Sequence, residues 1–206
     1  MMTVHSEFAT VDLIVGSSLE TRGVDAFVLA LIKAERQMRK LFTHLVMQYP
    51  CFTTADIAEL RTILAKHKRV YFEGFEAGIN QILWCTVEEL IGESYKRLRP
   101  RIAEAILFRN KIFHGQLTHN YLTREDLFIL VRDIRDWCYT LAEGAMTTIA
   151  YDGFDRDSLQ KSKSVDMSMR FRIQLHGIES YAAFIAQHMV RQRRLTPSTL
   201  TVSHGI

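Results

Sequence analysis

The sequence is poor in cysteine and proline and has no long apolar run. Its three cysteines, Cys51, Cys85 and Cys138, are far apart and form no C-x-x-C pair or cluster with histidine. The pattern predicts neither a structural zinc site nor a disulfide framework, and largely buried, reduced thiols are expected. The longest apolar run, 26-AFVLALI-32, is much shorter than the roughly 20 residues that span a bilayer. No basic segment precedes the apolar residues of the N-terminus, so no secretory signal and no membrane partner are expected, and the expected compartment is the cytoplasm.

The bulk composition is that of a globular domain. A chain of 206 residues can form one compact domain with a real core. Its 48% hydrophobic and 24% charged residues argue against general disorder. The net charge of +3 and the pI near 8.8 are mildly basic, which permits a polyanionic partner without requiring one.

The three prolines lie where helices can begin or end, at Pro50, Pro100 and Pro197. Residues 24–49 are predicted to form one long helix that ends at Pro50. Its apolar residues recur at steps of three and four, the pattern of a buried helix face: Phe27, Leu31, Ala34, Met38, Leu41 and Leu45.

Shorter helices are predicted over the next part of the chain. One fits residues 54–67, with Thr53 or Thr54 as its cap. The segment 68-KRVYFEGFEAG-78 has aromatics and two glycines and indicates a connector or a short extended piece. Thr86 and Glu89 have the spacing of a capping box and predict a helix that continues to about residue 98.

Two further helices follow. Pro100 is placed as the first residue of a helix that ends at Gly115, a natural left-handed terminator. After the loop 116-QLTHNYL-122, Thr123 with Asp126 begins another long helix. Its predicted buried face consists of Leu127, Leu130, Val131, Ile134, Trp137, Cys138 and Leu141.

The C-terminal region has a different pattern. Residues 151–164 indicate a loop, and 167-MSMRFRIQL-175 alternates apolar and polar residues as a strand does, although no partner strand can be identified. Residues 178–194 return to helical spacing and end in the basic run 191-RQRR-194. We therefore predict an all-α bundle over residues 1–150, with a small extension over 151–206 that contains a loop, a short strand, a helix and a basic end.

The stretch 109-RNKIFHG-115 holds the candidate functional residues. Its Arg-x4-His spacing alone carries little information, because Arg39 and His44 repeat it inside the first long helix. Side chains five positions apart on a helix point about 140° apart, so that pair cannot converge. Two other pairs match if one more residue is allowed between them: Arg61 with His67, and Arg170 with His176.

Three features set Arg109 and His114 apart. The helix is expected to end at Gly115, so the backbone at His114 leaves helical geometry and its side chain can take another direction. Asn110 adds a second polar side chain directly after the arginine. The pair also interrupts an apolar segment, where an unpaired arginine would be costly to bury.

In this setting, "RNKIFHG" resembles the signature of the HEPN superfamily. These are small all-α domains whose catalytic members carry Arg-x4–6-His, often with a polar residue after the arginine. The resemblance covers roughly residues 24–150. It implies a metal-independent endoribonuclease without a cofactor, a homodimer with two motifs across a shared cleft, and Arg109, Asn110 and His114 as the catalytic set. Some toxin members carry a tyrosine two residues after the histidine, and this chain has Gln116 there.

The implied chemistry is attack of the RNA 2′-hydroxyl on its own phosphate. His114 would move the protons and Arg109 would stabilise the phosphorane, while dimerisation would supply a second histidine. Basic side chains near the motif are candidates for RNA contacts, although for any single one of them a solvated surface position is the more frequent case: Lys96, Arg97, Arg99, Arg101 and Lys111.

Other interpretations remain open. In the HEPN family the setting is often a toxin–antitoxin or antiviral defence system, which would add an antitoxin protein as partner. A non-catalytic HEPN module that binds nucleotide, RNA or a partner protein is the second interpretation, and a helical scaffold is the third. In the plainest one, Arg109 and Asn110 brace the bundle and His114 only satisfies carbonyls at the end of a helix.

Overall fold

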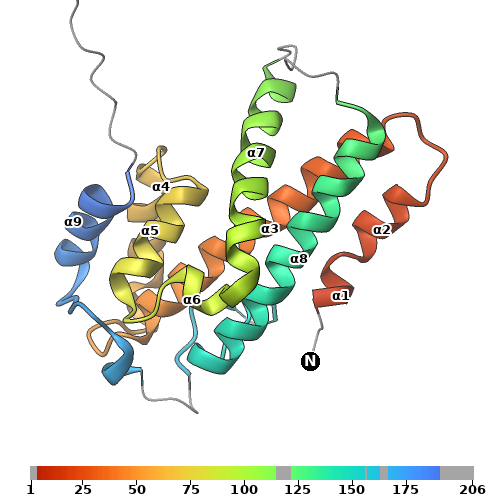
Figure 1. Cartoon of the computed structure of the whole chain (residues 1–206). Helices are drawn as coiled ribbons and strands as arrows, with labels where there is room; N and C mark the ends of the chain where they lie inside the picture. The colour runs from red at the N-terminus through yellow and green to blue at the C-terminus, as the bar shows by residue number, and fades with distance from the viewer. Residues whose placement is uncertain (1–3, 115–121, 156, 163–166, 191–206) are drawn as a thin grey trace, which may run out of the picture.

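The computed structural model describes residues 4–114, 122–155, 157–162 and 167–190, and these form an all-helical bundle (Figure 1). The predicted fold class is therefore confirmed. The α-helices and the short 3-10 helices (η) are α1 (Val4–Glu7), α2 (Ala9–Val15), α3 (Arg22–Gln48), η1 (Thr54–Asp56), α4 (Ile57–Lys66), α5 (Phe72–Ile82), α6 (Val87–Ile91), η2 (Gly92–Ser94), α7 (Tyr95–Phe113), α8 (Arg124–Ile149), η3 (Ser168–Arg170) and α9 (Ile178–His188).

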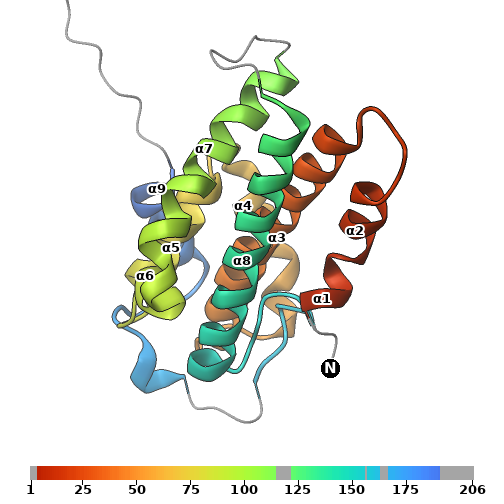
Figure 2. The same cartoon turned by 45° about the vertical axis from the view of Figure 1, so that its right-hand side comes forward.

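Three long helices form the centre of the bundle. Helices α3 and α8 lie side by side and run in the same direction, as both Figure 1 and Figure 2 show. This arrangement brings Gly23 close to Arg124 near the N-terminal ends of both helices. Further along, it brings Gln37 close to Cys138. Helix α7 runs antiparallel to α8: Arg97 contacts Asp136, and Arg101, further along α7, contacts the earlier Asp133 of α8.

Local signals account for where several helices begin. The side chains of Thr53, Thr86 and Thr123 each accept a hydrogen bond from a backbone N–H of the following turn. The backbone N–H of each threonine donates to the carboxylate three residues later. This capping box satisfies donors that the first turn leaves unpaired. All three predicted starts are confirmed, and Thr53 rather than Thr54 is the cap.

Helix α5 corrects the expectation of a connector at residues 68–78. Phe72 and Phe75 have helical spacing and are buried. The sequence did not predict this helix because Gly74 and Gly78 lie within it and glycine disfavours helix interiors. A Cβ on Gly74 would lie 2.3 Å from the carbonyl oxygen of Met189. Glycine is needed there because the chain after α9 passes directly over α5.

The expected helix start at Pro100 is also wrong. Helix α7 begins at Tyr95, so Pro100 lies in its second turn and cannot donate a helical hydrogen bond. Tertiary contacts hold the first turn in spite of this loss: Leu98 is fully buried, and Arg99 contacts Glu76 of α5.

No strand forms at residues 167–175. The described residues there contain a 3-10 turn and a single antiparallel bridge between Phe171 and Leu83. The alternation reflects an extended segment that packs on helices: Phe171 and Leu175 are buried, and the ring of Tyr49 stacks on Phe171 at 4.1 Å. A strand would need a neighbouring strand, whereas this segment contacts Tyr49 after α3 and Leu83 after α5.

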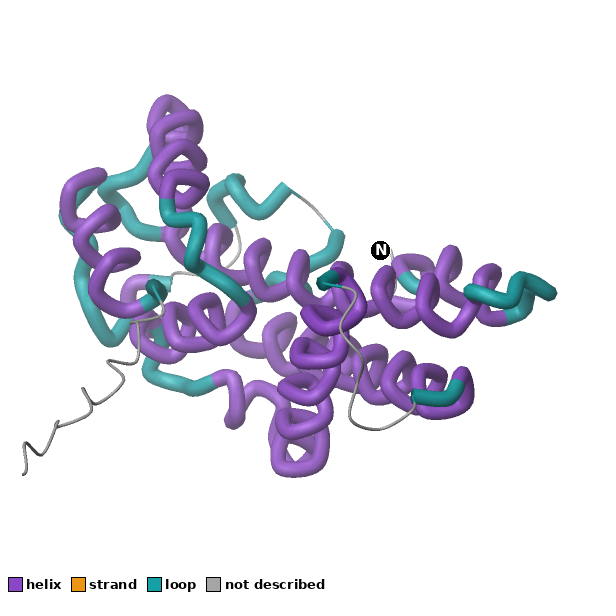
Figure 3. Tube along the Cα trace, turned by 90° about the horizontal axis from the view of Figure 1, so that it is seen from above, coloured by secondary structure: helices purple, strands orange, loops and turns teal. Residues whose placement is uncertain are grey.

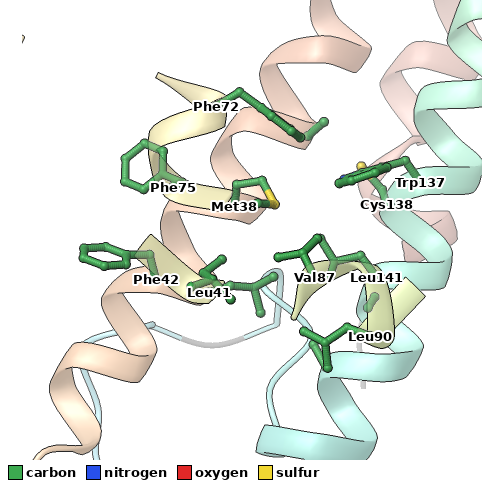
Figure 4. Packing of buried hydrophobic residues seen from close by; sticks show 14 of the residues in the cluster. Met38, Leu41, Phe42, Phe72, Phe75, Val87, Leu90, Trp137, Cys138 and Leu141 are labelled. Carbon is green, nitrogen blue, oxygen red and sulfur yellow. The ribbon is translucent and has the colours of Figure 1, made fainter. Parts of the chain in front are cut away.

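The core lies between α3, α5, α6 and α8, where Met38, Phe72, Val87 and Trp137 meet (Figure 4). The predicted buried faces of α3 and α8 are confirmed. Described residues after 150 extend the same core, and α9 packs on α4 and α5 (Figure 1). Seen from above in Figure 3, the described part of the chain consists of helices joined by loops.

The cysteines follow their expected chemistry only in part. Cys138 is fully buried, and burial raises the pKa of its thiol. Cys85 is half-buried and Cys51 is exposed, so the expectation of buried thiols is wrong for Cys51. Among the described helices, none is both long and apolar enough to cross a bilayer.

Candidate functional site

Arg109 lies near the C-terminal end of α7, on the side that faces α3. Ile106 is buried and Ile112 is half-buried against the core, and they hold this part of α7 on the bundle. Arg109 is therefore only partly accessible, with 17% of its side chain exposed. Its guanidinium makes a specific polar contact, which offsets the cost of burying an arginine in this apolar segment.

That contact is an ion pair with Glu35 of α3. Nη1 of Arg109 lies 2.8 Å from Oε1 and 2.9 Å from Oε2 of the carboxylate. Burial raises the pKa of Glu35, and the charge and hydrogen bond of Arg109 act in the opposite direction. Glu35 was not among the residues predicted from the sequence. No local signal could have found it, because it lies 74 positions before its partner.

Asn110 and His114 lie on the solvent side of the same helix end. Both are exposed, and a separation of four residues puts them on one helix face. Oδ1 of Asn110 accepts a hydrogen bond from Nε of Arg109 at 3.2 Å. Asn110 thus connects the half-buried guanidinium with the face that carries His114.

The backbone at His114 remains close to helical. Its N–H donates to the carbonyl of Asn110 at 3.1 Å, and its φ and ψ are −91° and 6°. His114 therefore continues the helical register and is not turned back toward Arg109. Gly115, expected to end the helix, and Gln116 lie outside the described residues.

Three of the five basic side chains expected to contact RNA are engaged with carboxylates. Arg97 contacts Asp133 and Asp136 of α8, and Arg101 contacts Asp133 and Glu104. The ion pairs with Asp133 and Asp136 join α7 to α8, whereas Arg101–Glu104 lies within α7.

Arg99 pairs with Glu76 of α5, its Nε at 2.9 Å and 3.1 Å from the two carboxylate oxygens. Tyr95 donates a hydrogen bond to the same carboxylate, and burial together with that bond raises the pKa of Tyr95 to about 12. Lys96 is exposed and Lys111 is half-buried, and neither forms an ion pair with another described residue. The lysines are therefore the candidates that remain open to phosphate.

The other Arg–His pairs have different surroundings. On α3, Arg39 is exposed with its guanidinium over the ring of Phe75, whereas His44 is fully buried, so the two diverge as expected. Arg61 and His67 line a common hollow beside α4, which the spacing of the sequence did not reveal. Arg170 and His176 are both exposed in the segment before α9.

Within the described residues, no group of three or more histidine, cysteine, aspartate or glutamate side chains is arranged to hold a metal ion. Comparison of the chain with protein-family models, with curated proteins and with solved structures gives no match. Any functional assignment therefore depends on the residues and geometry described above.

Proposed function

We propose that this chain is a metal-independent endoribonuclease of the HEPN type. The observation that carries the proposal is the array at the end of α7, in which Glu35 holds Arg109, Arg109 bonds Asn110, and Asn110 shares an exposed face with His114. The array combines a fixed guanidinium, an amide and an accessible imidazole within one turn and a half of helix. These are the groups that RNA cleavage without a metal needs. Within one chain Arg109 and His114 point about 140° apart, because His114 continues the helical register. The proposal therefore requires a second chain that brings its imidazole to the guanidinium of the first.

In the proposed reaction, O2′ of the substrate attacks the adjacent phosphorus and the P–O5′ bond breaks. One imidazole takes the proton of the 2′-hydroxyl, and a second, protonated imidazole gives a proton to the departing O5′. The products are a 2′,3′-cyclic phosphate and a 5′-hydroxyl. Arg109 retains Nη2 for a phosphate oxygen, since Nη1 binds Glu35 and Nε binds Asn110.

The proposal includes a homodimer, because the described residues of each chain supply one histidine at this site. Leu107 and Phe113 support this, since 62% and 63% of their surfaces are exposed on the same stretch of α7. Leu107 lies seven residues before His114, on the same helix face, so an interface between two chains over this face would cover it. A two-fold axis near them would bring two His114 side chains to one cleft.

A non-catalytic module that binds RNA, nucleotide or a partner protein is the second candidate. It is favoured by the ion pair itself, because Glu35 neutralises much of the charge that Arg109 would offer to a phosphorane. The two candidates differ in one requirement: catalysis needs the imidazole of His114, whereas binding does not. A toxin or antiviral defence role, with an antitoxin as partner, belongs to the catalytic candidate.

The test is incubation of purified protein with end-labelled RNA in EDTA. We expect cleavage by the unaltered protein and a loss of about 10²- to 10⁴-fold in His114→Ala, the usual size of general acid–base assistance. His176→Ala is the matched control, because it also removes an exposed histidine, at a site away from α7. Equal cleavage by all three proteins would indicate a contaminating nuclease and reject the proposal.

Arg109→Lys provides a second test, with circular dichroism to verify the fold. It keeps the positive charge but loses the paired contacts to Glu35 and Asn110, so cleavage is expected to fall while the helical content stays unchanged. Growth arrest on expression, relieved by the same substitution, would support a toxin role. RNA binding that persists without cleavage in the unaltered protein would favour the non-catalytic candidate.

A further inference from the structure

A second candidate site lies away from α7, in a hollow between α3, α4 and the connection from α4 to α5. Its volume is about 550 Å³, within the range of roughly 300–1,000 Å³ usual for small-molecule sites. Its walls come from parts of the chain that are distant in sequence, including Ser158 and Leu159 beyond α8.

The hollow is lined by cationic side chains. Arg39 and Lys40 come from α3, Arg61 from α4 and Lys68 from the connection, and His67 lies between the last two. No aspartate or glutamate is among the described residues that line it. The four arginine and lysine side chains therefore place several positive charges around one space with no carboxylate in its wall, which favours an anion.

Two of these cations are available to a ligand. Arg61 and Lys68 are exposed and make no ion pair with another described residue. Lys40 is more constrained: its Nζ donates to the carbonyl of Phe154 at 2.6 Å, and burial and then the charge of Arg36 lower its pKa. A bound anion would offset that repulsion.

Helix dipoles do not account for an anion preference here. The C-terminal end of α4 and the N-terminal end of α5 both line the hollow, and these ends carry partial charges of opposite sign. The charged side chains therefore determine the sign of the ligand.

Apart from Thr43 and Ser158, which hydrogen-bond to each other, the rest of the wall is apolar and aromatic. Leu64, Val70, Phe75 and Leu159 supply apolar surface, and Tyr71 at the rim has 49% of its surface exposed. Inorganic phosphate alone would leave this surface unused. A planar ring joined to a phosphate would use both parts, since the ring can lie against the aromatic side chains while the phosphate meets Arg61 and Lys68.

We propose that this hollow binds a nucleoside monophosphate or a phosphate ester of similar size. The juxtaposition that carries the proposal is four cationic side chains from three segments beside an apolar, aromatic wall. The site is separate from Arg109 and His114, and it does not depend on the proposed ribonuclease activity. A longer nucleic acid is not required, because the volume matches one nucleotide.

The test is isothermal titration of the full chain with AMP, GMP, CMP and UMP, each compared with its nucleoside and with inorganic phosphate. At least one monophosphate is expected to bind with a Kd on the order of 0.1 mM or tighter. Its nucleoside and inorganic phosphate are each expected to bind about tenfold or more weakly, since each lacks one half of the interaction. Absence of binding by all four monophosphates, or equal binding by a nucleoside, would overturn the proposal.

A charge-matched pair of variants locates the site. Arg61→Glu with Lys68→Glu reverses two cations in the hollow, and about a tenfold or greater loss of affinity is expected. Lys66→Glu with Arg69→Glu makes the same change of net charge at exposed neighbours that do not line the hollow, so affinity should change by less than about threefold. Equal losses in both variants would mean that the nucleotide responds to overall charge, and the assignment would be rejected.

His114→Ala separates this inference from the ribonuclease proposal. Nucleotide binding in the hollow should be unchanged in that variant, whatever happens to RNA cleavage. Loss of nucleotide binding in His114→Ala would place the ligand at the end of α7 and would contradict the site proposed here.

Discussion

Gln37 is the side chain whose removal should reveal most about how the bundle is held together. It is fully buried on α3, and its Nε2 donates to the carbonyls of Cys138 on α8, at 2.9 Å, and of Asp152, at 3.0 Å. One amide thereby joins the two central helices to the segment after α8. That segment continues to Ser158, part of the wall of the cationic hollow.

The cost of Gln37→Ala can be worked from these contacts. Each hydrogen bond contributes about 1 kcal/mol net, and a buried carbonyl left without a partner costs about 1–3 kcal/mol. The carbonyl of Cys138 lies within α8 and keeps its helical partner, so the larger penalty falls on Asp152. With a further cost for the cavity, the free energy of unfolding should fall by about 2–4 kcal/mol.

The assay is urea denaturation followed by circular dichroism, together with thermal melting. For a chain of this size, the expected loss corresponds to a decrease in Tm of about 5–15 °C. Gln37→Met is the control, because it keeps most of the side-chain volume but removes the amide donors; the two variants together separate the hydrogen bonds from the cavity. A loss below about 0.5 kcal/mol in Gln37→Ala would refute the reasoning.

Three further substitutions test other contacts, each measured by urea denaturation. In Gly144→Ala the new Cβ would lie 1.9 Å from the carbonyl oxygen of Leu90. The free energy of unfolding should therefore fall by more than about 3 kcal/mol, or no soluble protein should form. Normal stability would contradict the close packing of α6 on α8. Glu76→Gln removes the charge that binds Arg99, whose side chain is 22% exposed, and should cost about 1–3 kcal/mol, whereas an unchanged value would show that the pair is not stabilising. Burial raises the pKa of Glu35 above its usual 4.5, so above that pH the folded chain retains more protons there than the unfolded chain. Stability attributable to this carboxyl is therefore lost as pH rises through the folded pKa. The unfolding free energy of the unaltered protein, minus that of Glu35→Gln, should decrease from about pH 4 to pH 7. An increase of this difference with pH would contradict the assigned direction.

Local patterns in the sequence predicted much of the helical framework. The stripe from Phe27 to Leu45 is buried in α3, and the capping boxes at Thr86 and Thr123 begin α6 and α8. Such features depend on residues within one or two turns of each other, so they can be recognised without knowing the rest of the fold.

Two predictions from the sequence were wrong because the contacts that decided the structure come from residues far along the chain. Gly74 suggested a connector, yet its lack of a side chain serves the close approach of Met189 to α5. Pro100 suggested a helix start, yet the pairing of Arg99 with Glu76 allows α7 to begin earlier. In both cases packing outweighed local preference, because the energy came from partners far along the chain.

The candidate site shows the same division. The identities of Arg109, Asn110 and His114, and their place at the end of a helix before a break, could be read from the sequence. Only the tertiary structure decided that Glu35 neutralises Arg109 and that Arg97, Arg99 and Arg101 are paired with carboxylates. Helix formation follows from interactions between near neighbours, whereas the charge that a side chain presents depends on which distant groups the fold brings beside it.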